Sequence, residues 1–403
     1  MSDWHSRTLQ EIISTIESGT RPKGGVRIGE NSEGVPSYGG ENISMNGGML
    51  YDSVRMVPTS FATEMRRGVL SDKDVLINKD GANTGKSAIY RKPAGEKFAT
   101  INEHLFLLRC NQGIAEQEFL YHFLNSEFGK SQIAKVITGS AQPGLNSTFP
   151  EFVRIDLPPL PEQKKIAEIL SGIDKTIHIH QQKIEDLSTL LGEILREHYQ
   201  ERCENSDLQL EKVIRLPIQY GANASATKLQ SGEPRYIRIT DIKEDGALNE
   251  LNAVGIDLPS NDWNNYLLRE GDLLLARTGN TIGKSYLHKR TNEELVFAGY
   301  LLRVALDQEA YRPEYLFLFT QSDIYKDWIS ETSRTGAQPN INAKEYGAMP
   351  IPYSSISEQD AFIGRAMSLR RSKSILSNKV DKLKMLKQAI SSDLLSGHKR
   401  VSV

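Results

Sequence analysis

The chain of 403 residues is long enough for two or more domains that each bury a hydrophobic core. Its formal net charge of −2 excludes a strongly basic protein that binds nucleic acid through its overall charge alone. No basic start precedes an apolar run, and no uninterrupted apolar stretch is long enough to span a bilayer. The two cysteines, Cys110 and Cys203, lack the spacing of a zinc site or a redox pair. We therefore expect a cytoplasmic protein without a metal site or a disulfide.

Residues 1–160 predict a mixed α/β domain, because short apolar runs such as DVLI and HLFLL alternate with glycine-rich turns and a helical stretch near residues 117–137. One turn, GANTGKSA at residues 81–88, is similar to a phosphate-binding loop. Only three residues separate its first glycine from Gly-Lys-Ser, where that loop needs four. Asp80 also stands where the required glycine should be, and its charge would repel a phosphate. We interpret this stretch as a β-turn.

The same short form returns as GNTIGKSY at residues 279–286, and the surrounding sequence returns with it. Gly85 and Gly283 are 198 positions apart (283 − 85). EFLYHFLNSEF matches EYLFLFTQSDI, and TGSAQPGLN matches RTGAQPNIN, which places Gln142 and Gln338 at an offset of 196 (338 − 142). The chain is therefore a tandem duplication of a unit about half its length.

After the proline-rich LPPLP, residues 161–203 predict one long helix. Apolar residues there recur at alternating steps of four and three, the heptad pattern of a helix that packs along its length on another helix. A helix of about forty residues is roughly 60 Å long. The seam consists of Ile166, Leu170, Ile173, Ile177, His180, Ile184, Leu187, Leu191 and Ile194.

The second half repeats this order, with a mixed α/β domain predicted over residues 204–356 and a second long helix over residues 357–398. The second seam is rougher, since Lys373 and Lys387 occupy core positions. Neither helix is stable alone with an exposed apolar stripe, so we expect an antiparallel coiled coil with an internal pseudo-two-fold repeat. Each domain would then lie at one end of a rod. That α+β arrangement suits a bipartite ligand, of which duplex DNA is the commonest.

The order of these parts resembles the specificity subunits of type I restriction-modification systems. The resemblance covers nearly the whole chain and depends on three features: LPPLPEQKKIAEIL at the start of the first long helix, the paired DVLINKDGANTGKS and GDLLLARTGNTIGKS blocks, and the paired TGSAQPGLN and RTGAQPNIN segments. It implies two target-recognition domains that each read one half of a split target in double-stranded DNA. It also implies a helical spacer that docks two DNA-adenine methyltransferase subunits and the restriction or motor subunits.

The residues themselves give no sign of catalysis. No glycine-rich dinucleotide fingerprint follows a strand, and no Asn/Asp-Pro-Pro-Tyr/Phe tetrad of an amino-methyltransferase is present. We interpret His178 and His180 as seam residues rather than metal ligands, and Asp72, Asp74 and Asp80 as turn-forming residues rather than a nuclease cluster. We expect a chain without catalytic residues, cofactor or metal; S-adenosylmethionine, ATP and Mg²⁺ would bind its partner subunits.

Side chains suited to DNA stand in the paired loops. Arginine and lysine pair with guanine, and asparagine and glutamine pair with adenine, in the major groove. The first candidates are Lys79, Asn83, Lys86 and Gln142 in one copy, and Arg277, Asn280, Lys284 and Gln338 in the other. Further candidates are Arg21, Lys23, Arg91, Lys92, Arg235, Arg238, Lys289 and Arg290. An exposed lysine in an ordinary β-turn is the alternative interpretation of each Gly-Lys-Ser turn.

Two other functions remain open at this point. One is a single-chain, pseudo-dimeric DNA-binding regulator that acts without enzyme partners, which the near-neutral charge disfavours. The other is a coiled-coil scaffold whose end domains bind proteins, which does not explain the paired lysine, asparagine and glutamine loops.

Overall fold

The computed structural model of the chain describes residues 4–23, 34–44, 47–139, 143–204, 206–333 and 339–402. It divides into two compact units, one with residues 1–180 and 378–403 and the other with residues 181–377. Each unit therefore combines one mixed α/β domain with a segment from each of two long helices.

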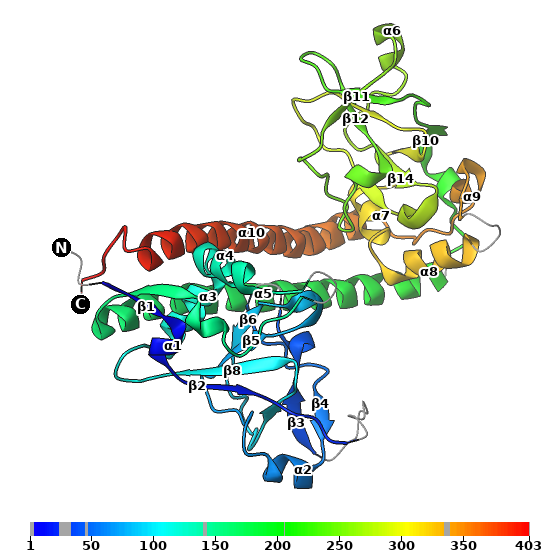
Figure 1. Cartoon of the computed structure of the whole chain (residues 1–403). Helices are drawn as coiled ribbons and strands as arrows, with labels where there is room; N and C mark the ends of the chain where they lie inside the picture. Colours follow the sequence, from blue (N-terminus) through cyan, green and yellow to red (C-terminus); the bar gives the residue numbers. More distant parts are fainter. Residues whose placement is uncertain are drawn as a thin grey trace. The chain divides into compact units, whose positions relative to one another are not determined.

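The first unit is built on a four-stranded antiparallel sheet in the order β2-β8-β5-β6 (Figure 1). Both faces of this sheet are buried: Val75 and Ile77 of β5 contribute to the core on the helical side, and Leu76 contributes to the core on the other side. This double burial explains why the strand sequence is a continuous apolar run instead of an alternating one. The strands are β2 (Ile13–Ser18), β8 (Leu105–Cys110), β5 (Val75–Asn78) and β6 (Ser87–Ile89).

Two further layers cover the sheet. Helices α3 (Gln117–Asn125) and α4 (Glu127–Val136) contribute to the first core. On the other side, β3 (Val35–Tyr38) pairs in parallel with β7 (Thr100–Ile101) and antiparallel with β4 (Arg55–Val57). The remaining elements are β1 (His5–Thr8), α1 (Leu9–Ile12), η1 (Gly40–Asn42), α2 (Thr59–Glu64), η2 (Gly81–Asn83), η3 (Phe149–Glu151) and β9 (Arg154–Leu157).

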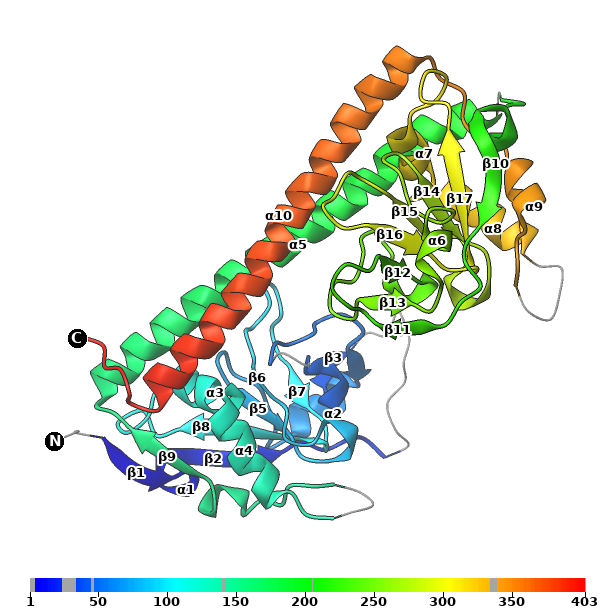
Figure 2. The ribbon, with the colours of Figure 1, turned by 90° about the horizontal axis from the view of Figure 1, so that it is seen from above.

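The second unit repeats this plan with the sheet β10-β17-β14-β15 (Figure 2). Leu273 of β14 lies opposite Val304 and Leu287, which is the register that Val75 has in the first unit. The predicted duplication is therefore confirmed at the level of strand register. The sheet strands are β10 (Ile214–Tyr220), β17 (Leu301–Leu306), β14 (Leu273–Ala276) and β15 (Ser285–Leu287).

Helices and a parallel strand pair again cover the two faces. The parallel pair is β12 (Arg235–Ile237) with β16 (Leu295–Phe297), and the helices are α7 (Pro313–Phe319) and α8 (Asp323–Thr332). The other elements are η4 (Leu210–Lys212), β11 (Ala226–Lys228), η5 (Ile239–Asp241), β13 (Val254–Ile256), α6 (Ser260–Trp263), η6 (Gly279–Thr281) and α9 (Ala343–Gly347).

The two long helices are α5 (Leu160–Glu204), with 45 residues, and α10 (Ile356–Leu395), with 40 residues. In the first unit their segments run antiparallel, because Asp174 pairs with Lys387 at 2.6 Å while the earlier Glu162 pairs with the later Arg400 at 2.6 Å.

In the second unit the His198 ring stacks on the Phe362 ring with centroids 3.5 Å apart, and Nε of Arg202 donates to the Ser354 hydroxyl. The later residue of one segment contacts the earlier residue of the other, so the segments again run antiparallel. The predicted packing of two long helices is confirmed. None of the helices within the described ranges is long and apolar enough to cross a membrane.

Candidate nucleic-acid interface

The candidate interface of the first unit is the turn that leads from β5 into β6. Lys79 and Asp80 follow the end of β5, and η2 begins directly after them. Gly81 and Gly85 have φ angles of 78° and 85°, in the left-handed region that glycine adopts without strain. A Cβ atom on Gly85 would lie 2.8 Å from Cγ2 of Ile133. The glycines therefore shape the turn and let it pack on α4.

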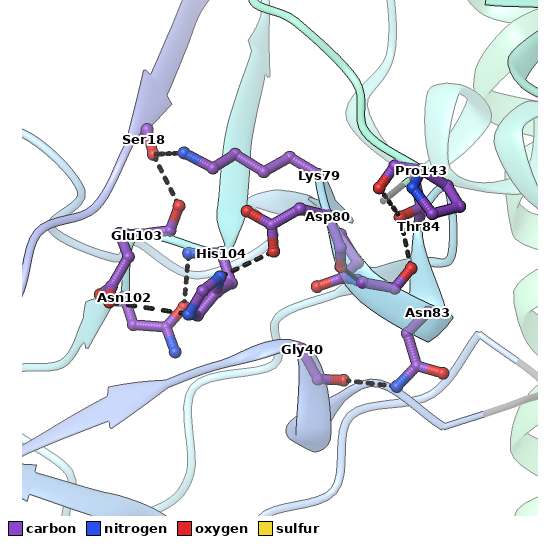
Figure 3. A network of polar contacts seen from close by, with 12 residues as sticks. Ser18, Gly40, Lys79, Asp80, Asn83, Thr84, Asn102, Glu103, His104 and Pro143 are labelled. Atoms are coloured by element: carbon purple, nitrogen blue, oxygen red, sulfur yellow. Dashed lines mark hydrogen bonds and ion pairs between the residues drawn. The ribbon is translucent and has the colours of Figure 1, made fainter. Parts of the chain in front are cut away.

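This turn is hydrogen-bonded to the TGSAQPGLN segment, the other motif that the two units share. The Thr84 hydroxyl donates to the Pro143 carbonyl at 3.0 Å (Figure 3). The Leu145 N–H donates to the Lys79 carbonyl at 2.6 Å. In the second unit, the Gly279 N–H donates to Pro339 and the Ile341 N–H donates to Arg277. The Gly-Lys-Ser turns thus lie beside the segments that follow Gln142 and Gln338. Those two glutamines themselves lie outside the described residues.

A third loop, which sequence reasoning missed, completes each site. The Lys79 N–H donates to the His104 carbonyl at 2.9 Å, and the Arg277 N–H donates to the Tyr300 carbonyl at 3.1 Å. His104 and Tyr300 are therefore equivalent, each directly before β8 or β17. The alignment of HLFLL with YLLRV pairs these two residues, but it does not show that they lie beside the turn.

The polar side chains of the first site contact one another in pairs. The Lys79 ammonium donates to the Ser18 hydroxyl at 3.1 Å, and His104 Nδ1 lies 2.7 Å from Asp80 Oδ1. Arg21 pairs with Glu103 at 3.1 Å on the neighbouring loop. The side chains of His104 and Asp80 are 48% and 42% exposed, so this pair faces solvent.

The other two candidates of the first turn contact each other. The Lys86 ammonium donates to the Asn83 side-chain oxygen, and the Asn83 amide nitrogen lies 3.5 Å from the Gly40 carbonyl. Figure 3 shows Asn83 pointing toward Gly40 at the edge of η2. Both side chains are half-buried, so the turn has a fixed shape.

The second site is arranged differently. The guanidinium of Arg277 lies over the ring of Tyr220, 5.0 Å from its centroid, and its Nε donates to Asn340 at 3.3 Å. The Lys284 ammonium pairs with the exposed Glu244 at 2.7 Å. Asn280 is exposed in η6.

Arg21 lies beside the first turn through Glu103, but the other further candidates have different structural settings. Arg235 is only 3% exposed and pairs with Glu250, so its guanidinium supports a loop from inside. The Arg238 guanidinium donates two hydrogen bonds to the Asp241 carboxylate, at 3.0 and 2.9 Å. Lys23, Lys92, Lys289 and Arg290 are exposed, and the Lys92 ammonium donates to the Lys97 carbonyl.

Arg91 supports the contact between the domain and α5. It pairs with Glu118 at 2.8 Å, and Glu118 also accepts from Ser171 of α5. Burial raises the pKa of Glu118, but hydrogen bonds from Arg91, Ser171 and Lys73 outweigh it and lower that pKa to about 2.

The acidic candidates have separate structural partners. Asp74 makes two hydrogen bonds of 2.7 Å to Arg109, Asp72 accepts from the Lys92 N–H at 2.9 Å, and Asp80 faces His104. Within the described part of the chain, no group of three or more histidine, cysteine, aspartate or glutamate residues is arranged to hold a metal ion. His178 is exposed on α5, while the two ring nitrogens of His180 are buried without a hydrogen-bond partner among the described residues.

Comparison with known proteins gives one consistent family. Residues 1–189 match the type I restriction modification DNA specificity domain. The chain is 23% identical to the type I restriction enzyme MjaVIII specificity subunit of Methanocaldococcus jannaschii, over 99% of this chain and 93% of that protein. It is 22% identical to the EcoKI specificity subunit of Escherichia coli, over 83% of this chain and 75% of that protein.

The fold has a solved relative as well. The crystal structure of a type I restriction-modification S subunit from M. genitalium matches with a TM-score of 0.65, covering 98% of this chain and 96% of that one. The two sequences are 13% identical, so this likeness concerns the fold alone.

Proposed function

Because similarity to type I restriction enzyme specificity subunits extends over nearly the whole chain, we propose that the chain is such a subunit and that it reads a bipartite target in double-stranded DNA for a methyltransferase complex. Specificity subunits are the non-catalytic recognition subunits of these systems. Each mixed α/β domain reads one half of the target in this proposal. A cytoplasmic location, where DNA meets its modification enzymes, is part of the same proposal.

One observation carries the proposal. The two units hold equivalent turns on equivalent backbone hydrogen bonds, Lys79 with His104 and Arg277 with Tyr300, yet they present different polar side chains there. A shared scaffold with different side chains is what two readers of different half-sites require, because base edges are distinguished by donor and acceptor pattern.

The partners follow from the same proposal. Two DNA-adenine methyltransferase subunits and the restriction or motor subunits dock on α5 and α10, and they bind S-adenosylmethionine, ATP and Mg²⁺. The exposed apolar side chains of these helices support docking, since apolar groups of this size in a long helix favour contact with another protein. They include Ile179 and Leu190 of α5 and Ile375, Met385 and Leu386 of α10.

Reconstitution tests the proposal directly. The purified chain alone should neither methylate nor cut DNA and should not hydrolyse ATP. Together with its cognate methyltransferase and S-adenosylmethionine, it should direct adenine methylation to one split sequence. Methylation or cleavage by the isolated chain would overturn the assignment.

Domain exchange tests the division of labour between the units. Replacing residues 1–152 with the matching segment of a related specificity subunit should change one half of the methylated target and leave the other half unchanged. Methylome sequencing of cells that carry the hybrid reads both halves at once. If both halves changed, the two domains would not read DNA independently.

A further inference from the structure

The residues around the two equivalent turns correspond position by position. Ser18 is the last residue of β2 and lies opposite Phe106 of β8; Tyr220 is the last residue of β10 and lies opposite Leu302 of β17. Phe106 and Leu302 each follow the first residue of their strand. Ser18 and Tyr220 are thus equivalent, and each contacts the basic residue that follows the central strand.

In the first unit the residue after Lys79 is Asp80, whose exposed carboxylate can accept hydrogen bonds. His104 Nδ1 lies 2.7 Å from Asp80 Oδ1, which fixes the orientation of the side chain. The second carboxylate oxygen has no hydrogen-bond partner among the residues that the structure describes. A carboxylate is repelled by phosphate, but it accepts hydrogen bonds from the exocyclic amino group of cytosine or adenine. Asp80 is therefore suited to a base edge and unsuited to the DNA backbone.

In the second unit a threonine stands at the position of Asp80, and the basic residue before it, equivalent to Lys79, is an arginine. The position after Arg277 is Thr278, so the residue that follows the arginine carries no carboxylate. The Arg277 guanidinium lies over the Tyr220 ring, and within the described part of the chain its side-chain hydrogen bond is the one from Nε to Asn340. A guanidinium that lies over an aromatic ring and is hydrogen-bonded at Nε has a restricted orientation, and its terminal N–H groups suit the O6 and N7 acceptors of guanine.

We propose that these two pairs select different bases in the two half-sites. Asp80, oriented by His104, accepts a hydrogen bond from the amino group of a cytosine or adenine in the first half-site. Arg277, oriented by Tyr220, donates to a guanine in the second. This inference depends on the proposed DNA-reading function and assigns base-reading roles to Asp80, His104 and Tyr220, which lie outside the basic and amide residues expected to bind DNA.

The test replaces the first pair with the residues at the equivalent positions of the second unit, Thr278 and Tyr300. The double variant Asp80→Thr with His104→Tyr is assembled with the cognate methyltransferase and offered a duplex library with both half-sites randomised. Preference for the amino-bearing base at one position of the first half-site should fall about tenfold or more, while the second half-site stays unchanged. Asp80→Asn, which keeps the shape of the side chain and adds a donor, should shift the preferred base at the same position.

Arg277→Gln provides the reciprocal measurement. It should remove the guanine preference at one position of the second half-site and leave the first half-site unchanged. Asp156→Thr, at an exposed position of β9, is the matched control and should change neither half-site.

The possible outcomes distinguish a failure of the base-reading assignment from a failure of the proposed DNA-reading function. If the unmodified complex methylated without sequence preference, the proposed function would fail. If it methylated one split target and the folded variants kept every base preference, or lost affinity equally for all sequences, only the base-reading assignment would fail.

Discussion

Gln163 and Gln359 make the same buried junction at the start of the two long helices. The amide oxygen of Gln163 accepts the Glu116 N–H at 2.8 Å, and its nitrogen donates to the Pro158 carbonyl at 2.8 Å. Gln359 makes the equivalent bonds, at 2.8 Å from the Arg312 N–H and at 2.9 Å to the carbonyl five residues before it. Both side chains are fully buried. Each glutamine thus ties the entry of its helix to the first turn of the neighbouring short helix.

Truncating either glutamine should destabilise its own unit. Gln163→Ala leaves the Glu116 N–H and the Pro158 carbonyl buried without their partner, which costs about 1–3 kcal/mol. Gln359→Ala should cost the second unit a similar amount. Urea unfolding measures the change, with Gln182→Ala at an exposed position of α5 as the control. A loss no larger than that of the control would show that the junction does not stabilise the fold.

His122 should make the first unit sensitive to acid. Burial, with a smaller effect from Lys387, lowers its pKa from 6.5 to about 3. The folded unit therefore keeps the ring neutral, whereas the unfolded chain takes up a proton below pH 6.5. The contribution of the neutral His122 ring to the free energy of unfolding is complete above pH 6.5. It is lost as the pH falls below this value, by up to about 1.4 kcal/mol per pH unit. The charged groups near the ring are Asp174, Lys387, Glu118 and Arg91.

The second unit supplies the variant that tests this. Leu318 stands where the first unit has His122 and is fully buried, so His122→Leu fits the shared scaffold. Hydrogen exchange measures protection factors for the α3 amides, which correct each rate for the intrinsic effect of pH. Between pH 7 and pH 5 these protection factors should fall in the parent chain and stay constant in the variant. Glu118, whose pKa is about 2, loses its stabilising charge only below this window. Equal pH dependence in both proteins would contradict the assignment.

The Gly-Lys-Ser lysines should act through phosphate. Lys284→Ala removes a positive charge that is partly offset by Glu244, and Lys86→Ala removes one beside Asn83. Each change should weaken DNA binding for all sequences alike and reduce the slope of log K against log salt by about one. Fluorescence anisotropy at several salt concentrations measures the slope, and Lys130→Ala on the exposed side of α4 is the control. A changed base preference would instead identify the lysine as a reader.

The sequence predicted the elements better than the contacts between them. Heptad steps predict a helix over residues 161–203, and α5 spans Leu160–Glu204, because an uninterrupted period over many turns is a local signal. The second helix is predicted to residue 398 but ends at Leu395, since Gly397 takes a φ of 73° that a helix does not allow.

The interface was harder to predict because pairing partners depend on tertiary structure. Arg235 and Arg238 are basic residues in a repeated segment, yet Glu250 and Asp241 engage them. His104 reaches the site because β8 lies beside β5 in the sheet, a neighbour relation that residue spacing does not reveal.

The long helices should act as a ruler if they set the distance between the two half-sites. One heptad added to each paired seam, 166–194 and 362–390, at matching depths, keeps the antiparallel register and adds about 10 Å. DNA rises about 3.4 Å per base pair, so the preferred spacer should grow by roughly two to three base pairs. Three base pairs also rotate one half-site by about 100°, at roughly ten pairs per turn, so part of the activity should be lost.

Selecting methylated targets from a library of spacer lengths measures the optimal spacer length. An insertion in only one helix breaks the register and serves as the control. An active double insertion with an unchanged optimal spacer would show that the helices do not set the spacing.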